Sequence, residues 1–433
     1  MRSKIRAWLK SLSLTKEYDV NLPNSNRTKP IVANFFIVFM ILIPTLSTIL
    51  FMYLSDWAVF RLAGIKGSDF KDYQTILSYR ECLRETNLFE FPPYFSECWA
   101  GFNYGFSAIL LVGALDYLLG SIAVIGWITI FLVITTLVGI SFFCGSHDLV
   151  GRIFQSLIII SPGILLLYER GNLDSWIYIF SIILVLGHKH LNPLLLFVCL
   201  FLLTLIKFHI LFASLYLISR RPISRNYKAF MFISISLATG ISLAPMAGLI
   251  PYNWYLSFGS FMPLVYLDFG STSVNFESLA LGMRIMIGAV FFVCLTFLAR
   301  WVSPSFRRLT TLETDSRSNE SVVLTFFSIC YLSSFFLSTN YDYRVIFLLP
   351  ALIVFDRELF TRGTSSKERK FFIALTISSL YIGSIYGAPY FYLQACQLSG
   401  DLGLSLISAI LLFRLFSSLQ VSGSQRQPET YSQ

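Results

Sequence analysis

Charged side chains are scarce in this sequence of 433 residues. Asp, Glu, Lys and Arg together make up 13% of the chain, whereas soluble domains carry roughly 25%. Hydrophobic residues reach 55%, and apolar runs of the roughly 20 residues needed to cross a bilayer core recur between residues 31 and 417. The composition excludes an ordinary soluble protein and predicts a membrane protein.

Three further patterns are missing. The apolar runs are continuous and do not alternate at every second residue, so a membrane β-barrel is not expected. The seven cysteines show no C-x-x-C or other metal-ligand spacing, so no metal ligands and no bound cofactor are predicted, although a divalent metal stays open. The net charge of +9 comes without an aromatic-basic motif, so nucleic acid is not an expected partner.

The basic residues instead gather in polar segments expected in the cytoplasm, as the positive-inside rule describes. Residues 1–30 carry seven Lys and Arg against two acids and are predicted to be a cytoplasmic tail. Residues 31–417 are predicted to form one multi-span domain of the plasma (inner) membrane, beginning with an uncleaved span at 31–53. The Ser- and Gln-rich residues 418–433 are expected to be a disordered cytoplasmic tail.

The first large loop has a different charge balance. Residues 54–103 hold seven acidic and five basic residues, which fits the extracytoplasmic side, and together with 104–118 they form the predicted first loop 54–118. Cys82 and Cys98 share this loop and could form a disulfide there. The cysteines in or beside apolar runs are expected to be packing residues: Cys144, Cys199, Cys294 and Cys330.

Two topologies of the middle of the chain each give twelve crossings. In one, 104–118 is a span, 192–218 is a single helix and the turn 169–174 is cytoplasmic. In the other, 104–118 is a re-entrant or interfacial helix, the long run breaks into a hairpin at Lys207, and 169–174 faces outside after a span at 153–168. We prefer the second, because a lysine buried within a membrane helix costs about 3 kcal/mol or more.

In the preferred topology the ionisable residues gather where helices leave the membrane on one side. Asp69 and Asp72, spaced as i and i+3, are expected on one face of a helix just after the first span. The remaining candidates on that side are Tyr73, Glu169, Arg170, Asn172, Asp174, Lys207, His209, Tyr341, Asp342 and Arg344. A coupled transporter would instead keep ionisable residues near mid-membrane.

Carboxylates beside cations predict a particular chemistry. A carboxylate can take the proton from an attacking hydroxyl, and Lys or Arg can neutralise a departing phosphate. A lipid-phosphate sugar would supply both the leaving group and a reason to sit in a bilayer. Simpler roles stay open: Asp69 could cap a helix, Arg170 could pair with Asp174 across the Gly171-Asn172 turn, and Lys207 could snorkel.

The layout resembles the GT-C-fold glycosyltransferases. Asp69-Phe70-Lys71-Asp72-Tyr73 is similar to the Asp-x-x-x-Tyr-type element that follows the first span in glycosyltransferase family 87, the mannosyltransferase-like group. The turn 169–174 occupies the place of that group's Gly- and Asn-containing turn, and Lys207 resembles the Lys ending the fifth span of GT-C enzymes. Phe208-His209 departs from the family, which would have a Pro shortly after that Lys.

The resemblance implies an all-α, polytopic, GT-C-like protein of about twelve transmembrane helices. It implies inverting transfer of a hexose such as mannose from a polyprenyl phosphate to an extracytoplasmic glycan or glycolipid. Asp69 would be the catalytic base with Asp72 as its substitute, and the other candidates would contact substrate. No nucleotide sugar or covalent intermediate would be involved.

Two other functions stay open as alternatives. A polymerase or ligase of lipid-linked oligosaccharides tends to rely on Arg-rich outer loops, but the loop 251–278 has no Lys or Arg. A transporter or flippase would be expected to show an internal repeat and mid-membrane charge, and the sequence shows neither.

Overall fold

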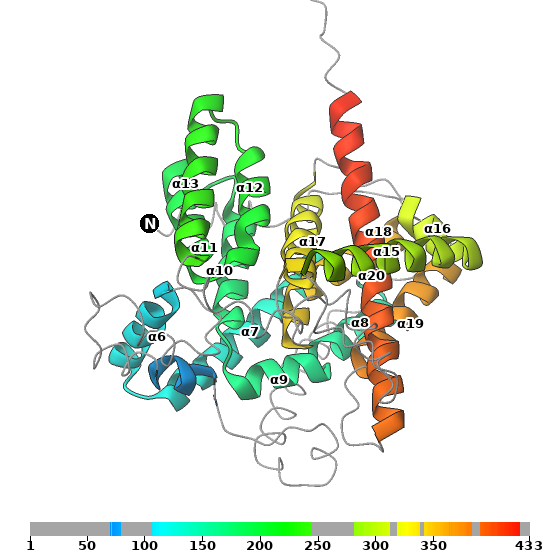
Figure 1. Cartoon of the computed structure of the whole chain (residues 1–433), viewed down its shortest axis with the longest axis horizontal. Helices are drawn as coiled ribbons and strands as arrows, with labels where there is room; N and C mark the ends of the chain where they lie inside the picture. The colour runs from blue at the N-terminus through cyan, green and yellow to red at the C-terminus, as the bar shows by residue number, and fades with distance from the viewer. Residues whose placement is uncertain are drawn as a thin grey trace, which may run out of the picture.

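The computed structural model describes residues 70, 72–78, 106–243, 281–311, 318–337, 342–362, 364, 366–382 and 390–424. All regular secondary structure in this part of the chain is helical, which confirms the predicted all-α class (Figure 1). In chain order the helices are α6 (Phe106–Leu119), α7 (Ile122–Cys144), α8 (Leu149–Ile159), α9 (Pro162–Arg170), α10 (Asp174–Gly187), α11 (Pro193–Ile206), η2 (Phe208–Ile210), α12 (Leu211–Ser219), α13 (Arg225–Leu243), α15 (Leu281–Val302), α16 (Pro304–Thr311), α17 (Asn319–Leu337), η8 (Asp342–Phe347), α18 (Leu349–Thr361), α19 (Ser366–Ile382) and α20 (Tyr390–Ser424).

Several predictions fall outside these residues, namely the tail 1–30, the first span and the Cys82–Cys98 disulfide. Helix α20 continues to Ser424, so the segment predicted to be disordered from residue 418 begins as helix. The preceding apolar turns are already helical, so the helix does not need a new nucleus. Each further residue then gains a backbone hydrogen bond as it joins the helix.

The helices are those of a membrane protein. By length and apolar composition alone, two described segments can cross a bilayer: Ile122–Cys144 in α7 and Ser399–Ser417 in α20. The pair Gly288–Val302 and Pro304–Thr311, bent by 113°, would make a third. Other apolar helices are shorter, α10 and α11 having 14 residues each and so a length of about 21 Å. Twelve crossings therefore stay a prediction.

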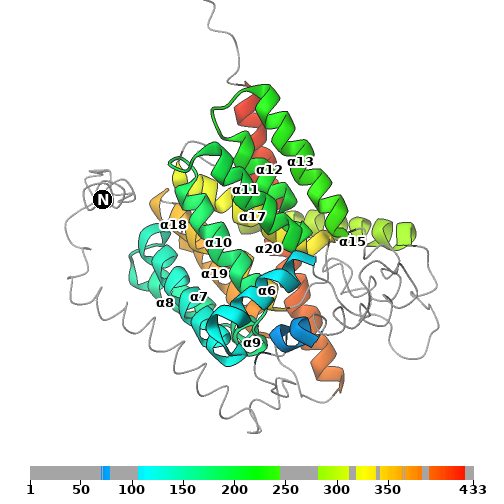
Figure 2. The same cartoon turned by 90° about the vertical axis from the view of Figure 1, so that its left-hand side faces the viewer.

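The chain reverses direction at Lys207, as the preferred topology predicts. Lys207 follows α11 in an extended conformation, and its ammonium lies against Asp174 at the start of α10. At the far end of the same helices, Arg221 after α12 donates to the carbonyls of His188 and Leu191, between α10 and α11. Helix α11 is therefore antiparallel to both α10 and α12, and the three lie side by side (Figures 1 and 2).

The position of residues 72–78 also favours the preferred topology. This short helix contacts the N-terminal half of α7 through Tyr73 and Thr129, so the segment from 79 to 121 begins and ends at the same end of the bundle. A single crossing by α6 would separate those ends, and residues 79–105 contain no second long apolar run. This arrangement is the one expected of a re-entrant or interfacial α6, which stays a prediction.

The span predicted at 153–168 is instead two helices. Helix α8 ends at Ile159 and α9 begins at Pro162, after Ser161 in an extended conformation. Proline is favourable at the first position of a helix, but it cannot continue α8, and it pushes the residue before it away from helical geometry. Helix α9 consequently lies across the lower end of the bundle in Figure 1.

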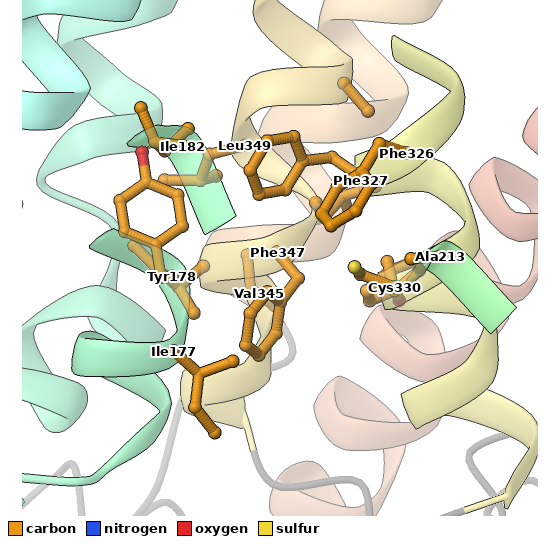
Figure 3. Packing of buried hydrophobic residues seen from close by; sticks show 14 of the residues in the cluster. Ile177, Tyr178, Ile182, Ala213, Phe326, Phe327, Cys330, Val345, Phe347 and Leu349 are labelled. Atoms are coloured by element: carbon orange, nitrogen blue, oxygen red, sulfur yellow. The ribbon is translucent and has the colours of Figure 1, made fainter. Parts of the chain in front are cut away.

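An aromatic core joins α10, α17 and η8. The rings of Tyr178 in α10 and Phe327 in α17 lie 5.9 Å apart, and Phe347 of η8 packs beside them (Figure 3). All three side chains are fully buried. Because large aromatic side chains dominate the burial of apolar area, this core holds η8 firmly against the helices that carry the candidate site.

The predicted packing role is confirmed for two of the four apolar-run cysteines. Cys144 and Cys330 are buried, whereas Cys199 is half-buried and Cys294 is exposed on α15. An exposed position on an apolar helix of a membrane protein is one that lipid can cover, so Cys294 does not pack against the described part of the protein.

At the end of the bundle opposite Lys207, Arg369 of α19 ties two further segments together. Its guanidinium donates two bonds of 2.8 Å to Asp148, before α8, and bonds of 2.7 and 3.1 Å to Asp356 in α18. Asp356 is fully buried and also accepts from Ser146. The planar guanidinium suits this double bidentate contact.

Candidate functional site

Asp72 begins the short helix 72–78 at the same end of the bundle as Lys207, and it is 9% exposed. Phe70, two residues earlier, has φ +60°, in the left-handed region that a right-handed helix does not include. The described helix therefore begins at Asp72, and the shared helix face of Asp69 and Asp72 stays a prediction. Asp69 itself lies outside the described residues.

The Phe70 ring anchors this segment on α7. It lies over Gly126, where an added Cβ would overlap it, and it meets Trp127 edge-on with ring centroids 6.3 Å apart. A left-handed conformation in a bulky residue is uncommon and costs of order 1–3 kcal/mol. Burial of the ring, which is 2% exposed, offsets this cost and fixes where the helix begins.

Tyr73 provides a second anchor. Its hydroxyl forms a 3.1 Å hydrogen bond with Thr129, and its ring covers Gly171, whose φ of +59° and lack of a side chain allow the close approach. Burial raises the pKa of the Tyr73 phenol, and the neighbouring Asp72 carboxylate adds to the rise. Tyr73 therefore stays a neutral phenol beside the carboxylate and acts as a packing and hydrogen-bonding group.

Asn172 connects Asp72 to α10. It is fully buried, its Nδ2 donates to the Asp72 Oδ2, and its Oδ1 accepts from the backbone N–H of Asp174 at 2.9 Å. Gly171 ends α9 in the left-handed conformation and lets the chain turn into α10. The turn 169–174 is thus brought against Asp72.

A buried ion pair completes the described cluster. Lys207 Nζ donates to both oxygens of Asp174 at 2.7 and 2.8 Å, and the two side chains are 2% and 0% exposed. Lys207 therefore does not extend to the bilayer surface. Its ammonium pairs with the carboxylate of Asp174. The alternative partner of Asp174 that the sequence offers, Arg170, has a side chain outside the described ones. Asp72, Asn172, Asp174 and Lys207 form a continuous chain of polar contacts.

His209 and η8 border this cluster. His209 lies two residues after Lys207, is fully buried, and packs edge-on against Phe347 with ring centroids 5.1 Å apart. Helix η8 packs against α9, so the backbone of Asp342 and Arg344 lies near the same end of the bundle. These segments therefore lie at one end of the described bundle, and the assignment of that end to one membrane face stays a prediction.

Some candidates cannot be placed as side chains. Glu169 and Arg170 end α9, and Asp342 and Arg344 begin η8, but only their backbone is described; Tyr341 lies outside the described residues. Sequence reasoning missed Phe70 and Thr129. A hydroxyl inside an apolar run was the one signal for Thr129, and many such hydroxyls in this chain bond only to their own helix.

Within the described ranges, no group of three or more His, Cys, Asp or Glu side chains could hold a metal ion. The described groups of this cluster are two carboxylates, one amide and one ammonium, and all four are buried.

Replacing Gly126 with alanine tests the packing of the Phe70 ring against α7. The new methyl group would overlap the ring, and overpacking of this kind typically costs about 1–3 kcal/mol. Gly139 in the same helix has nothing within 4 Å of an added Cβ, so Gly139→Ala should be neutral or stabilise by up to about 1 kcal/mol. Thermal unfolding in detergent measures both; equal melting temperatures for the two variants would contradict the described packing.

Comparison of the chain with models of known families, with curated proteins and with solved structures finds no match.

Proposed function

We propose that this protein is an integral-membrane, inverting glycosyltransferase of GT-C type. It transfers a hexose such as mannose from a polyprenyl-phosphate sugar to an extracytoplasmic glycan or glycolipid. The observation that supports this most is the polar chain from Asp72 through Asn172 to the Asp174–Lys207 pair, because it sets a carboxylate beside a fixed cation at one end of an apolar bundle.

The charge distribution supports an extracytoplasmic site. The opposite end of the described bundle carries many basic residues in the segments 188–190, 220–228 and 357–370. Under the positive-inside rule that end faces the cytoplasm, so the cluster at Asp72 faces outside. A donor whose lipid tail lies in the bilayer would present its phosphate and sugar at this level.

In the proposed reaction, a hydroxyl oxygen of the acceptor attacks the anomeric carbon of the donor sugar. The bond between that carbon and the phosphate oxygen breaks, polyprenyl phosphate leaves with the bonding electrons, and the anomeric centre inverts. Asp69 takes the hydroxyl proton as general base, and Asp72 is the second carboxylate able to do so. No covalent intermediate forms.

The remaining residues bind and position substrate in this proposal. Arg344 in η8 and the ammonium of Lys207 offset the charge of the departing phosphate, as cations do in other phosphate sites. Asp174 holds that ammonium in place and cancels part of its charge, so we assign the larger share of phosphate binding to Arg344. In this proposal the sugar and acceptor contacts come from Glu169, Arg170, Tyr341 and Asp342, and the fully buried Tyr73, Asn172 and His209 support the site from within the protein.

Purified protein in proteoliposomes tests the enzyme against a transporter. The probe is a mannosyl phosphoryl polyprenol with a radiolabelled sugar, supplied with crude membrane glycolipids as acceptor. We expect release of polyprenyl phosphate and label in a new glycolipid. Movement of the intact donor between leaflets with no release would contradict the transferase and establish a flippase.

A further inference from the structure

Arg152, near the start of α8, forms no ion pair with any side chain that the structure describes. Its Nη1 donates to the Ser141 carbonyl at 3.1 Å and to Gln155 Oε1 at 3.3 Å, and its Nη2 donates to His147 Nδ1 at 2.6 Å. None of these acceptors carries a negative charge. A guanidinium has five N–H donors, so within the described residues at least two of them are left for a further acceptor.

His147 places another donor beside this guanidinium. Arginine only donates, so the Nδ1 of His147 accepts and the ring proton lies on Nε2. Because His147 is exposed, this N–H can donate to a group outside the protein. The Phe142 ring, near the end of α7, packs beside both: its centroid lies 6.0 Å from Arg152 Cζ and 6.5 Å from the centroid of the His147 ring. The three side chains form one surface site between α7 and α8.

The ion pairs described at this end of the bundle balance one another, five carboxylates with five guanidiniums. Two carboxylates share one arginine, and two arginines share one carboxylate. Arg152 therefore adds a positive charge that these pairs do not offset, and an anion is the ligand that complements it. The groups that balance are Asp148 and Asp356 with Arg369, Glu358 with Arg362 and Arg414, Glu320 with Arg357, and Glu368 with Arg308.

Exposed apolar side chains surround this charge. Leu149 and Ile153 are four residues apart on α8, and Arg152 lies three residues after Leu149, so the three share one face of the helix. Helix α7 is long and apolar enough to cross a bilayer, and the end of such a span lies at the level of the lipid headgroups. Acyl chains would then cover the exposed set, which is Phe142, Phe143, Leu149, Val150 and Ile153.

We propose that Arg152 and His147 bind the phosphate of an anionic phospholipid, whose acyl chains lie along the exposed apolar side chains of α7 and α8. Residues 72–78 contact the opposite half of α7, so this lipid belongs to the leaflet away from the candidate site. Arginine suits the role because its N–H groups match the spacing of phosphate oxygens. The lipid site does not depend on the proposed transferase reaction.

Native mass spectrometry of the intact protein tests the site with two lipids of equal acyl chains. Phosphatidylglycerol has an anionic headgroup, whereas the headgroup of phosphatidylcholine has no net charge. From an equimolar mixture, we expect wild type to retain more phosphatidylglycerol. Arg152→Met keeps an apolar stem without the charge and should lower the ratio of the two bound lipids about fivefold, the effect of one basic residue at an anionic surface. Equal retention of the two lipids by wild type would overturn the proposal.

Arg220→Met is the matched control. Arg220 is exposed after α12 at the same end of the bundle, its Nε donates to the Tyr216 hydroxyl at 3.3 Å, and its Cζ lies 5.4 Å from the centroid of that ring. The variant therefore removes the same charge from a similar arginine–aromatic contact on another helix. We expect the wild-type lipid ratio. An equal fall in both variants would assign the preference to the overall charge of this end and contradict a site at Arg152.

A second pair of variants leaves Arg152 in place, in case its loss prevents folding. Leu149→Glu sets a carboxylate three residues before Arg152, where it pairs with the guanidinium and repels phosphate, and Leu149→Gln has nearly the same shape without the charge. We expect the lipid ratio to fall in Leu149→Glu alone; equal ratios in the two variants would overturn the role of Arg152. Inorganic phosphate at the lipid concentration should not displace phosphatidylglycerol, because it lacks acyl chains. Displacement would make free phosphate the ligand and overturn the lipid site.

Discussion

Replacing Lys207 with alanine is expected to destabilise the protein by about 3–5 kcal/mol. The variant leaves Asp174 ionised, fully buried and deprived of the ammonium that donates to both of its oxygens. Breaking a buried pair from one side typically costs this much because it removes the charge that offsets the one left behind. The pair also holds the start of α10 against residue 207, where the chain reverses direction after α11. On heating, we therefore expect the packing of α10, α11 and α12 against one another to be lost first.

Two further variants make this result interpretable. Lys228→Ala removes a lysine whose ammonium donates to the Ser219 carbonyl at the far end of α12, and a surface change of this kind should cost about 0.5 kcal/mol or less. The double variant Lys207→Met with Asp174→Asn buries no charge and should recover part of the lost stability. Melting temperatures in detergent compare all three; a Lys207→Ala protein as stable as Lys228→Ala would contradict the described ion pair.

Replacing Asp69 with asparagine is expected to lower the rate of hexose transfer by about 10²–10⁴-fold, the usual contribution of a general base. Asparagine preserves shape and hydrogen bonding but cannot accept the proton of the attacking hydroxyl. Asp72→Asn should lower the rate by a smaller factor if Asp72 supports the base, and by the larger factor if it is the base. In the second variant an amide oxygen still accepts from Asn172, so the packing of residues 70–78 is retained.

Asp116→Asn provides the control for both. Asp116 lies on α6, the helix before α7, and belongs to none of the contacts that join Asp72, Asn172, Asp174 and Lys207. We expect transfer at the wild-type rate. Wild-type rates in both Asp69→Asn and Asp72→Asn, measured with protein of normal thermal stability, would remove the first-loop carboxylates from the mechanism.

The sequence predicted those features that follow from the cost of charge in a bilayer. The penalty for a lysine inside a helix predicted the reversal at Lys207, and the Gly171-Asn172 pair predicted a tight turn; the structure confirms both. The grouping of these residues at one end follows from helix direction alone, since α9 ends and α10 begins where α11 ends.

Features that depend on tertiary packing were beyond the sequence. The order Asp69-Phe70-Lys71-Asp72 does not indicate that Phe70 adopts a left-handed conformation. The energetic cost of that conformation is offset by burial of the Phe70 ring on Gly126, which is a tertiary contact. Pro162 could have predicted the break between α8 and α9, but the apolar run through it reads as one span.

The side of the membrane on which residues 72–78 lie is the most direct test of an extracytoplasmic active site. Asn172 is buried, so the probe belongs on Ser78, which is exposed on the same short helix as Asp72. A Ser78→Cys protein without other cysteines should react with an impermeant maleimide in intact cells, and Lys189→Cys, exposed at the opposite end of α10, should react only after permeabilisation. The reverse pattern would put the cluster in the cytoplasm and contradict transfer from an extracytoplasmic polyprenyl-phosphate sugar.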